Sequence, residues 1–229
     1  QLDATKSLKE NIILTLLNPL SSIYSYAENM LVSDLAVGMN AERIFAIIGN
    51  GKKKYSDIEG KLGLPNNGLL SKQRKNLLAM DMIAKVYPVN KEGDNKKVSY
   101  ELTDNLMRFW YTYVYHNKGA LRMLGAEAFY ENYIAPALTT FISHRFEEIA
   151  RTYFSLQVKD GLRSGILHIG TYYYDDLVQK TNGEFDVALQ RKTGYDIYEV
   201  KSLSSPLTEK AMRREESPIR TLQGITVLQ

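Results

Sequence analysis

The stretch GEFDVALQRKTGYDIYEVK, residues 183–201, decides the fold of the C-terminal half of the chain. Two runs rich in β-branched and aromatic residues flank a polar turn, and this pattern predicts a β-hairpin. Each run also carries charge, at Asp186, Glu199 and Lys201, where a strand usually buries apolar side chains. Because alternate residues of a strand share a face, Glu199 and Lys201 point the same way, and pairing of the two runs can bring Asp186 beside them.

A cluster of two carboxylates and one ammonium group has two interpretations. Carboxylate oxygens suit a hard divalent cation such as Mg²⁺, or Mn²⁺, so Asp186 and Glu199 are candidate metal ligands. A metal held there polarises a phosphodiester and acidifies a bound water, while Lys201 orients or deprotonates the attacking water. The alternative is a set of solvent-facing charges that form cross-strand pairs, since the pattern is short and degenerate.

The segments around this hairpin predict a sheet flanked by helices. Strand-like composition begins after residue 160, and helical patterns precede and follow it. The order helix, three strands, helix, strand favours a mixed sheet with helices on its faces. On the first helix, the spacing predicts that Phe141, Phe146, Ile149 and Phe154 face inward. The expected strands cover 165–176, 184–190, 195–201 and 224–229, and the expected helices cover 136–157 and 206–220.

The first half of the chain shows a second pattern. Three helices are expected over 41–51, 55–64 and 65–82, with Ser56 as the N-cap and Glu59 completing a capping box in the second of them. A strand, a turn rich in Gly, Asn and Asp, and a returning strand follow over 83–103, which predicts a hairpin. Three helices and a hairpin are typical of a winged helix-turn-helix domain, which binds DNA with its third helix and its hairpin wing.

Charge favours the same region as a nucleic-acid interface. Residues 41–100 hold 12 Lys and Arg against 6 Asp and Glu, although the net charge of the whole chain is only +3. A polyanion is therefore expected to dock there first. The alternatives are a solvated helix face or a surface that contacts another protein. The candidate DNA-binding residues are Lys72, Arg74 and Lys75 on the third helix and Lys91, Lys96 and Lys97 on the wing.

Composition excludes several other classes of function. The chain of 229 residues is 44% hydrophobic and contains no cysteine, so disulfides, thiolate nucleophiles and cysteine-ligated metals are absent. No apolar run reaches the roughly 20 residues that span a bilayer, so no membrane partner and a cytoplasmic location are expected. The start at Gln1 and the apolar end GITVLQ suggest a segment of a longer protein.

Other motifs carry weaker signals. The sequence IIGNGKKKYS lacks two of the residues that a phosphate-binding P-loop requires, so it predicts the end of a helix and no nucleotide site. His116, His144 and His168 are not spaced as metal ligands, although His144 lies three residues before Glu147 and can approach the acidic cluster. Residues 104–118 have apolar spacing typical of a packed helix, with Leu106, Phe109, Trp110 and Tyr113 on one face.

The C-terminal part resembles the PD-(D/E)xK nuclease superfamily. Its signature is a helix-borne Glu, then an Asp, then Glu-x-Lys, and the matching residues are Glu147 in FEEIAR, Asp186 in EFDVAL, and Glu199 and Lys201 in YEVK. The resemblance implies a restriction-endonuclease-like sheet in which Glu147 binds a second metal or orients Lys201. Glu148 is the alternative helix carboxylate, and Glu147 is preferred because it directly follows Phe146.

The whole chain resembles the C-terminal half of archaeal-type P-loop ATPases, in which an AAA-like ATPase precedes a winged helix and a PD-(D/E)xK-like domain of unknown function. The similar stretches include LKENIILTLLNP, IFAIIGNGKKKYSDI, YELTDNLMRFWYTYVY, FEEIARTYF and HIGTYYY. One departure is Tyr172, Tyr173 and Tyr174, where relatives tend to have paired tryptophans. The resemblance implies that ATP binds only to the ATPase domain of the same full-length chain, before Gln1. The expected regions are a helical remnant over 1–38, the winged helix over 39–103, a helical connector over 104–138 and the nuclease-like domain over 139–229.

The fold expected is therefore α+β, a winged helix followed by a nuclease-like mixed sheet, and three functions stay open. The first is a DNA-binding, Mg²⁺-dependent nuclease region of an ATPase. The second is an inactive nuclease-like scaffold that binds DNA or a protein and regulates the ATPase. The third is a transcription regulator with a C-terminal sensing domain.

Overall fold

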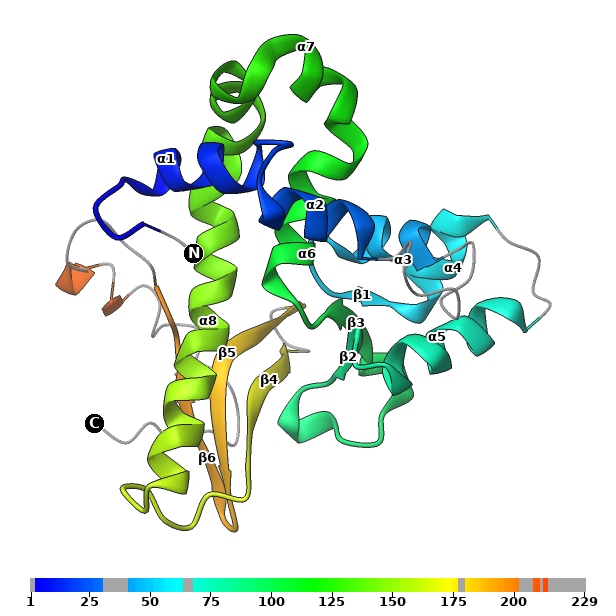
Figure 1. Ribbon diagram of the computed structural model, residues 1–229. Helices are drawn as coiled ribbons and strands as arrows, with labels where there is room; N and C mark the ends of the chain where they lie inside the picture. Colours follow the sequence, from blue (N-terminus) through cyan, green and yellow to red (C-terminus); the bar gives the residue numbers. More distant parts are fainter. Residues whose placement is uncertain are drawn as a thin grey trace. The chain divides into compact units, whose positions relative to one another are not determined.

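The computed structural model has an α+β architecture with two small antiparallel sheets and one long helix (Figure 1). Its chain divides into two compact units, the first formed by 1–86 with 98–138 and the second by 87–97 with 139–229. Within the described part of the chain, no helix combines the length and apolar character needed to cross a bilayer. The structure describes residues 3–30, 41–63, 68–176, 180–201, 208–210 and 212–213.

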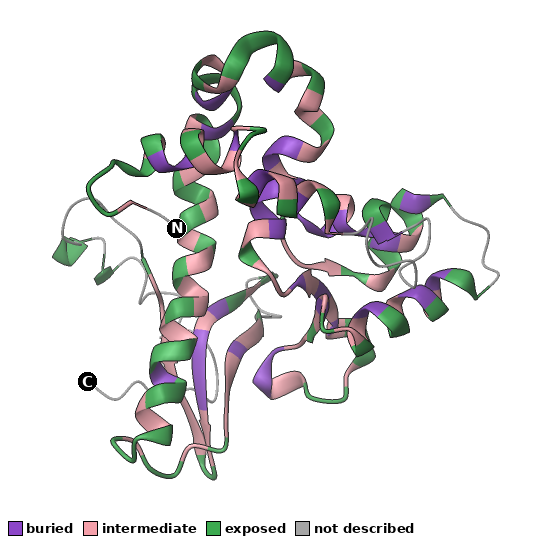
Figure 2. Cartoon of the chain, in the orientation of Figure 1, coloured by how far each residue is buried: buried purple, intermediate pink, exposed green. Residues whose placement is uncertain are grey.

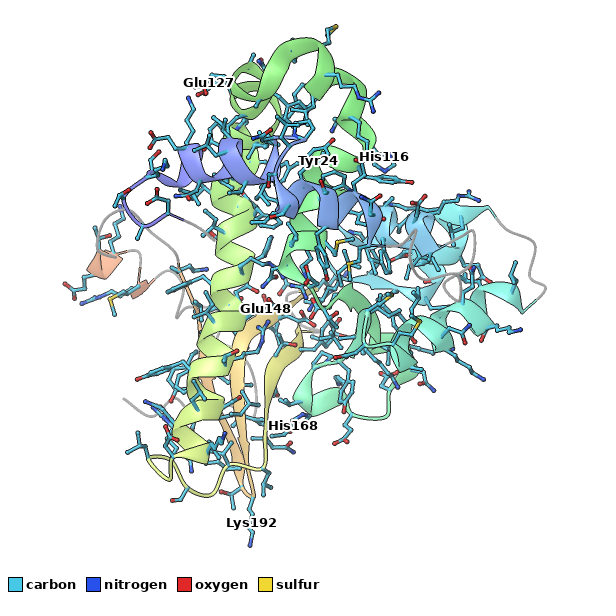
Figure 3. The ribbon with its side chains drawn as sticks, viewed as in Figure 1. Tyr24, His116, Glu127, Glu148, His168 and Lys192 are labelled. Carbon is cyan, nitrogen blue, oxygen red and sulfur yellow. The ribbon has the colours of Figure 1, made fainter. Side chains whose placement is uncertain are left out.

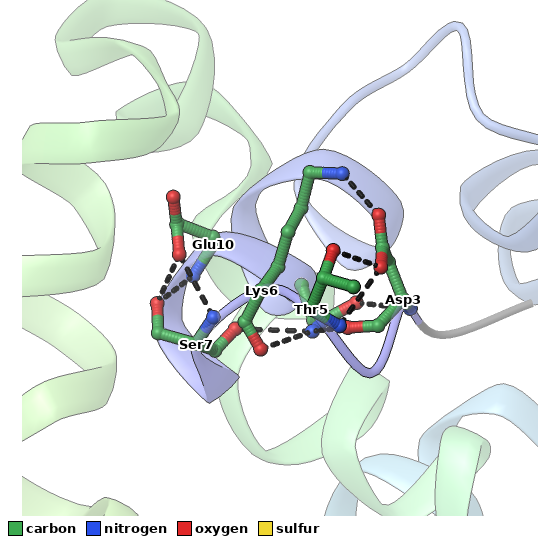
Figure 4. Close-up of polar contacts among 6 residues, drawn as sticks. Asp3, Thr5, Lys6, Ser7 and Glu10 are labelled. Carbon is green, nitrogen blue, oxygen red and sulfur yellow. Dashed lines mark hydrogen bonds and ion pairs between the residues drawn. The ribbon is translucent and has the colours of Figure 1, made fainter.

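The first unit begins with short helices. Ser7 caps α1 reciprocally, because its hydroxyl accepts from the Glu10 N–H at 3.2 Å and its own N–H donates to the Glu10 carboxylate at 2.8 Å (Figure 4). Asp3 closes the preceding turn by accepting from the backbone and the hydroxyl of Thr5. The elements are α1 (Leu8–Asn11), a π-helical turn (Ile12–Leu16) and α2 (Ser22–Asn29).

Three helices and a three-stranded sheet follow. The sheet has the order β1-β3-β2 with both pairings antiparallel, so the third strand lies between the other two. Ile44, Ile48, Leu77, Ile83 and Leu102 are almost fully buried, which places the core between the helices and this sheet. The elements are α3 (Ala41–Ile48), β1 (Lys53–Lys54), α4 (Tyr55–Leu62), α5 (Leu69–Ala79), β2 (Ile83–Val86) and β3 (Ser99–Leu102).

The three helices occur in the predicted order, but one predicted cap is wrong. The second helix starts at Tyr55, so Ser56 lies inside its first turn instead of capping it. The carboxylate of Asp57 accepts from the Lys54 N–H at 3.3 Å and takes the place that the prediction gave to Glu59. The third helix is shorter than predicted and ends at Ala79.

The rest of the first unit is a helical path with an aromatic core. Phe109, Trp110 and Tyr113 are buried, as their spacing predicts, and Trp110 meets Tyr24 edge to face with ring centroids 4.9 Å apart. Helical backbone continues from the π turn that ends at Ile134 into the helix that contains Pro136. This proline therefore lies in the first turn of a helix and does not interrupt the helical path. The path consists of α6 (Asn105–Phe109), a π turn (Trp110–Val114), a 3₁₀ turn (Tyr115–Asn117), α7 (Lys118–Phe129), a π turn (Tyr130–Ile134) and α8 (Ala135–Lys159).

The second unit packs the long α8 on a three-stranded sheet of order β4-β5-β6 (Figure 1). The predicted hairpin is present, since β5 and β6 pair antiparallel from Val187↔Tyr198 to Arg191↔Gly194. Figure 3 places Lys192 at the turn that joins them. The described strands are all antiparallel, and the predicted strand 224–229 lies outside the described residues. The strands are β4 (His168–Asp176), β5 (Thr181–Arg191) and β6 (Gly194–Tyr198).

The core of this unit is narrow. Phe154 of α8 packs with Val187 and Leu189 of β5, and the buried residues concentrate along that strand (Figure 2). Of the four aromatic and aliphatic residues predicted to face inward from the helix, only Phe154 is fully buried. Phe146 is 40% exposed and Ile149 is 59% exposed, so the described part of the chain does not cover these two side chains.

The tip of the first hairpin, residues 87–97, belongs to the second unit. The Asn90 amide donates to the Tyr173 carbonyl at 2.8 Å and accepts from the Tyr173 N–H at 3.0 Å. One side chain therefore occupies both main-chain groups of an edge-strand residue, which protects the edge of β4. Gly170 allows this approach, because a Cβ atom there would lie 2.8 Å from Cγ1 of Val89.

Candidate functional site

Asp186 and Glu199 meet where the β5–β6 ladder ends. The register places Val187 opposite Tyr198, so the next pair along the two chains is Asp186 and Glu199. Beyond the ladder, the Val200 N–H donates to Oδ2 of Asp186 at 2.8 Å. The Asp186 carboxylate thus replaces a main-chain acceptor and holds the segment that carries Glu199.

Glu147 reaches this end of the sheet from α8. It lies two helical turns before the buried Phe154 and therefore on the same face of the helix. Burial raises the pKa of Glu147 and the charge of Asp186 raises it further, while His144 opposes the shift through a contact of 3.1 Å between its Nδ1 and Oε1 of Glu147. Glu148, labelled in Figure 3, instead pairs with Arg145 at 3.1 Å.

Glu199 is the most perturbed acid of the cluster. Burial, the charge of Asp186 and a hydrogen bond with that carboxylate together raise its pKa to about 7. Lys201 opposes the shift, with 3.5 Å between its Nζ and Oε2 of Glu199. Glu147 and Glu199 thus both have raised pKa values beside Asp186, and partly buried acids of this kind are typical of functional sites.

The donor set fits a divalent cation that takes few protein ligands. Within the described residues, no three acidic or histidine side chains stand close enough together to enclose a metal ion. Mg²⁺, however, is usually held by one or two carboxylates and completes its shell with waters and substrate oxygens. Asp186 and Glu199 supply such a pair, because the register of the β5–β6 ladder places them opposite each other at its end.

The residues predicted to contact DNA from α5 have different surroundings. Lys72 and Lys75 are exposed. Arg74 is half-buried and stacks on the rings of Tyr55 and Tyr100, with its guanidinium carbon 4.6 Å and 5.4 Å from their centroids. Its Nη1 also donates to the Tyr100 hydroxyl at 3.1 Å, so Arg74 packs within its own unit.

The predicted wing lysines lie on the hairpin tip. Lys96 is exposed, whereas Nζ of Lys97 lies 3.5 Å from the ring centroid of Tyr173 and Nζ of Lys91 lies 6.0 Å from it. These two lysines therefore make cation–π contacts within the second unit. Among the tip lysines, Lys96 is the most accessible to a phosphate backbone.

Sequence reasoning missed Arg151. Its Nη1 donates to the main-chain carbonyl of Asp186 at 2.8 Å, and it lies one turn after Glu147 on α8. The spacing of four residues from Glu147 was the available signal, since such residues share a helix face. Of the other histidines, His168 starts β4 (Figure 3) and meets the ring of Tyr87 at 6.2 Å.

Comparison with known proteins gives one match. Residues 110–214 match a family model, DUF234, described as archaea bacterial proteins of unknown function. The matched segment includes α8 and the strands that carry the acidic cluster. No curated protein matches the chain. No solved structure matches it either.

Proposed function

We propose that the second unit holds a divalent-metal-dependent site that hydrolyses phosphodiester bonds of DNA, as in the PD-(D/E)xK nucleases that the sequence resembles. The observation that carries this proposal is the pairing of Asp186 with Glu199 at the end of the β5–β6 ladder, with Lys201 beside Glu199 and Glu147 close enough for the charge of Asp186 to act on it. These four residues come from three separate segments of the chain, which makes their meeting by chance less expected than the short motif alone.

Asp186 and Glu199 would hold the metal in this proposal. The bound ion would supply Lewis acidity to the scissile phosphate and lower the pKa of a water. Lys201 lies beside Glu199 and is 39% exposed, so its ammonium can orient an attacking water and offset negative charge on the phosphate. The charge of Asp186 acts on Glu147, which adds a third carboxylate that favours cation binding.

We infer that residues 41–102 form a winged helix that binds DNA. The order of α3, β1, α4, α5, β2 and β3 and the strand order β1-β3-β2 support this inference. Lys72 and Lys75 on α5 supply the accessible charge. A phosphate-contacting role predicts that removing each lysine weakens binding uniformly across DNA sequences and reduces its salt dependence.

A second candidate is a scaffold that binds DNA or protein without cutting it, as the regulatory region of a longer P-loop ATPase. Two observations favour it. Within the described part of the chain, no ready-made three-ligand group exists for a metal. In addition, the tip lysines Lys91 and Lys97 lie against Tyr173, which leaves them less available to DNA.

Metal binding and cleavage together distinguish the two candidates. Calorimetric titration with Mn²⁺ and Mg²⁺ at pH 8 should detect one binding event in the wild type and none in Asp186→Asn. Supercoiled plasmid should be nicked by the wild type with Mn²⁺ and left intact by that variant. Glu184→Gln is a matched control, because Glu184 is exposed on the same strand. Equal cleavage by the wild type and Asp186→Asn contradicts the proposed site, and metal binding without cleavage favours the scaffold.

A further inference from the structure

The strand that carries Asp186 contains an extra residue. Pairing of β4 with β5 joins Gly170 to Ala188 and, after a shift of register, Tyr172 to Phe185. One residue of β4, Thr171, therefore faces two residues of β5, Asp186 and Val187. This count defines a β-bulge in β5 at the position of the acidic cluster.

The bulge explains why Asp186 can act on a residue of α8. In a regular strand, successive side chains point to opposite faces of the sheet. Val187 is fully buried in the core that includes Phe154 of α8, so regular alternation would direct Asp186 away from the helix. Instead, the charge of Asp186 contributes to the raised pKa of Glu147 on that helix, after burial as the first cause. The bulge interrupts this alternation at Asp186, the residue whose charge acts on α8.

Arg151 holds the backbone at this irregular position. A bulge disrupts the ladder and leaves main-chain groups without a strand partner. Nη1 of Arg151 donates to the Asp186 carbonyl at 2.8 Å in a partly buried contact. Arg151 also lowers the pKa of Glu147, against the larger effects of burial and Asp186, so its charge acts on the same cluster.

We propose that Arg151 is a positioning residue that fixes the bulge in β5 and thereby directs the Asp186 carboxylate toward Glu199 and the Val200 N–H. The metal-binding consequence rests on the proposed function, whereas the orientation of Asp186 does not. The guanidinium suits this role because its planar donors reach a carbonyl in a fixed direction and stay charged at all relevant pH values.

The test uses the amide of Val200, whose acceptor is Oδ2 of Asp186. Arg151→Met keeps an unbranched side chain and removes every donor. We expect the Val200 amide to exchange with solvent at least tenfold faster in this variant, while amides in the middle of β5, such as that of Ala188, keep their protection. Arg151→Lys retains one donor and should restore most of the protection. Lys159→Met, at the exposed end of α8, controls for the loss of one positive charge.

A role limited to general stability predicts a different result. Exchange would then accelerate equally along β5 and β6, and that outcome would overturn the inference, as would an unchanged Val200 amide in Arg151→Met. If Arg151→Met does not fold, Arg151→Lys is compared with wild type: a small loss of protection confined to Val200 supports the positioning role, and an equal loss at Val200 and Ala188, or no loss, overturns it.

A second readout separates this inference from the proposed function. The affinity for Mn²⁺, obtained from the paramagnetic resonance signal of the free ion, should fall roughly tenfold or more in Arg151→Met. This is the usual effect of losing a residue that orients a metal ligand. Loss of Val200 protection in a protein whose wild type binds no Mn²⁺ supports the positioning role and contradicts the metal site. Unchanged Val200 protection overturns the positioning role whatever the metal result.

Discussion

Replacing Glu199 with glutamine should stabilise the second unit at alkaline pH. Burial and the neighbouring Asp186 raise the pKa of Glu199 from 4.5 to about 7 in the folded chain. A raised pKa in the folded state means that the folded protein binds the proton more tightly than the unfolded chain. Stability from this group is therefore complete below pH 4.5 and is lost as the pH rises through about 7.

The magnitude follows from the size of the shift. A change from 4.5 to about 7 corresponds to about 3 kcal/mol, at roughly 1.4 kcal/mol for each pH unit. The Glu199 side chain is 22% exposed, and solvent screening reduces the effect, so we expect a gain of about 1 to 3 kcal/mol at pH 8. At pH 4 the carboxyl is neutral in both states, and Glu199→Gln should match the wild type.

The assay must follow the second unit. The chain has one tryptophan, Trp110, and it lies in the first unit, so its fluorescence does not report on the acidic cluster. Hydrogen exchange of peptides from β5 and β6, measured against urea at pH 4 and pH 8, gives the free energy of unfolding of the relevant strands. Exchange rates are corrected for the intrinsic effect of pH.

Two results would refute the reasoning. The first is a Glu199→Gln variant that is no more stable than the wild type at pH 8, and the second is the same gain at both pH values. Glu184→Gln, exposed on β5, should change little at either pH. Addition of Mg²⁺ at pH 8 should stabilise the wild type but not Glu199→Gln, because ligand binding to the folded state alone raises stability.

Three further changes test the fold around the site. Asn90→Asp places an acceptor against the Tyr173 carbonyl, so urea unfolding of the second unit should show a loss of about 1–3 kcal/mol, and an unchanged midpoint would contradict the edge contact. Gly170→Ala brings Cβ to 2.8 Å from Cγ1 of Val89 and should cost about 1–3 kcal/mol; adding Val89→Ala should recover part of it, and additive losses would contradict the contact. Lys72→Gln should reduce DNA affinity and the slope of its salt dependence, measured by fluorescence anisotropy, and an unchanged slope would show that Lys72 contacts no phosphate.

The hairpin of β5 and β6 could be predicted because its signals are local. Alternating apolar residues, a polar turn that ends in Gly194, and charges at fixed positions define the register within one short stretch. That register alone places Asp186 opposite Glu199. The helix that carries Glu147 is also a local feature, since its apolar spacing recurs over several turns.

The features that sequence reasoning missed depend on distant partners. The bulge at Asp186 has no glycine to mark it and is defined only by pairing with β4. Asn90 and Tyr173 are separated by 83 positions along the chain. The exposure of Phe146 and Ile149 depends on which segments pack against each part of α8, and helical spacing does not encode this.

Arg74 illustrates a different limit. A basic residue between two exposed lysines on a candidate DNA-binding helix has the sequence pattern of a phosphate contact. Arg74 instead stacks on Tyr55 and Tyr100, which lie before and after the helix in the sequence. Charge patterning thus identifies a basic region but does not distinguish packed guanidinium groups from accessible ones.

The extra residue in β5 makes the acidic cluster sensitive to the length of the chain as well as to its chemistry. Deleting one residue between Phe185 and Ala188 would restore a regular ladder with β4 while keeping the strand in place. All four acidic and basic side chains could survive the deletion of Val187 in an evolving lineage, yet the aspartate would take the place of Val187, opposite Tyr198 instead of Glu199. A descendant could therefore lose the site while its motif still reads as intact.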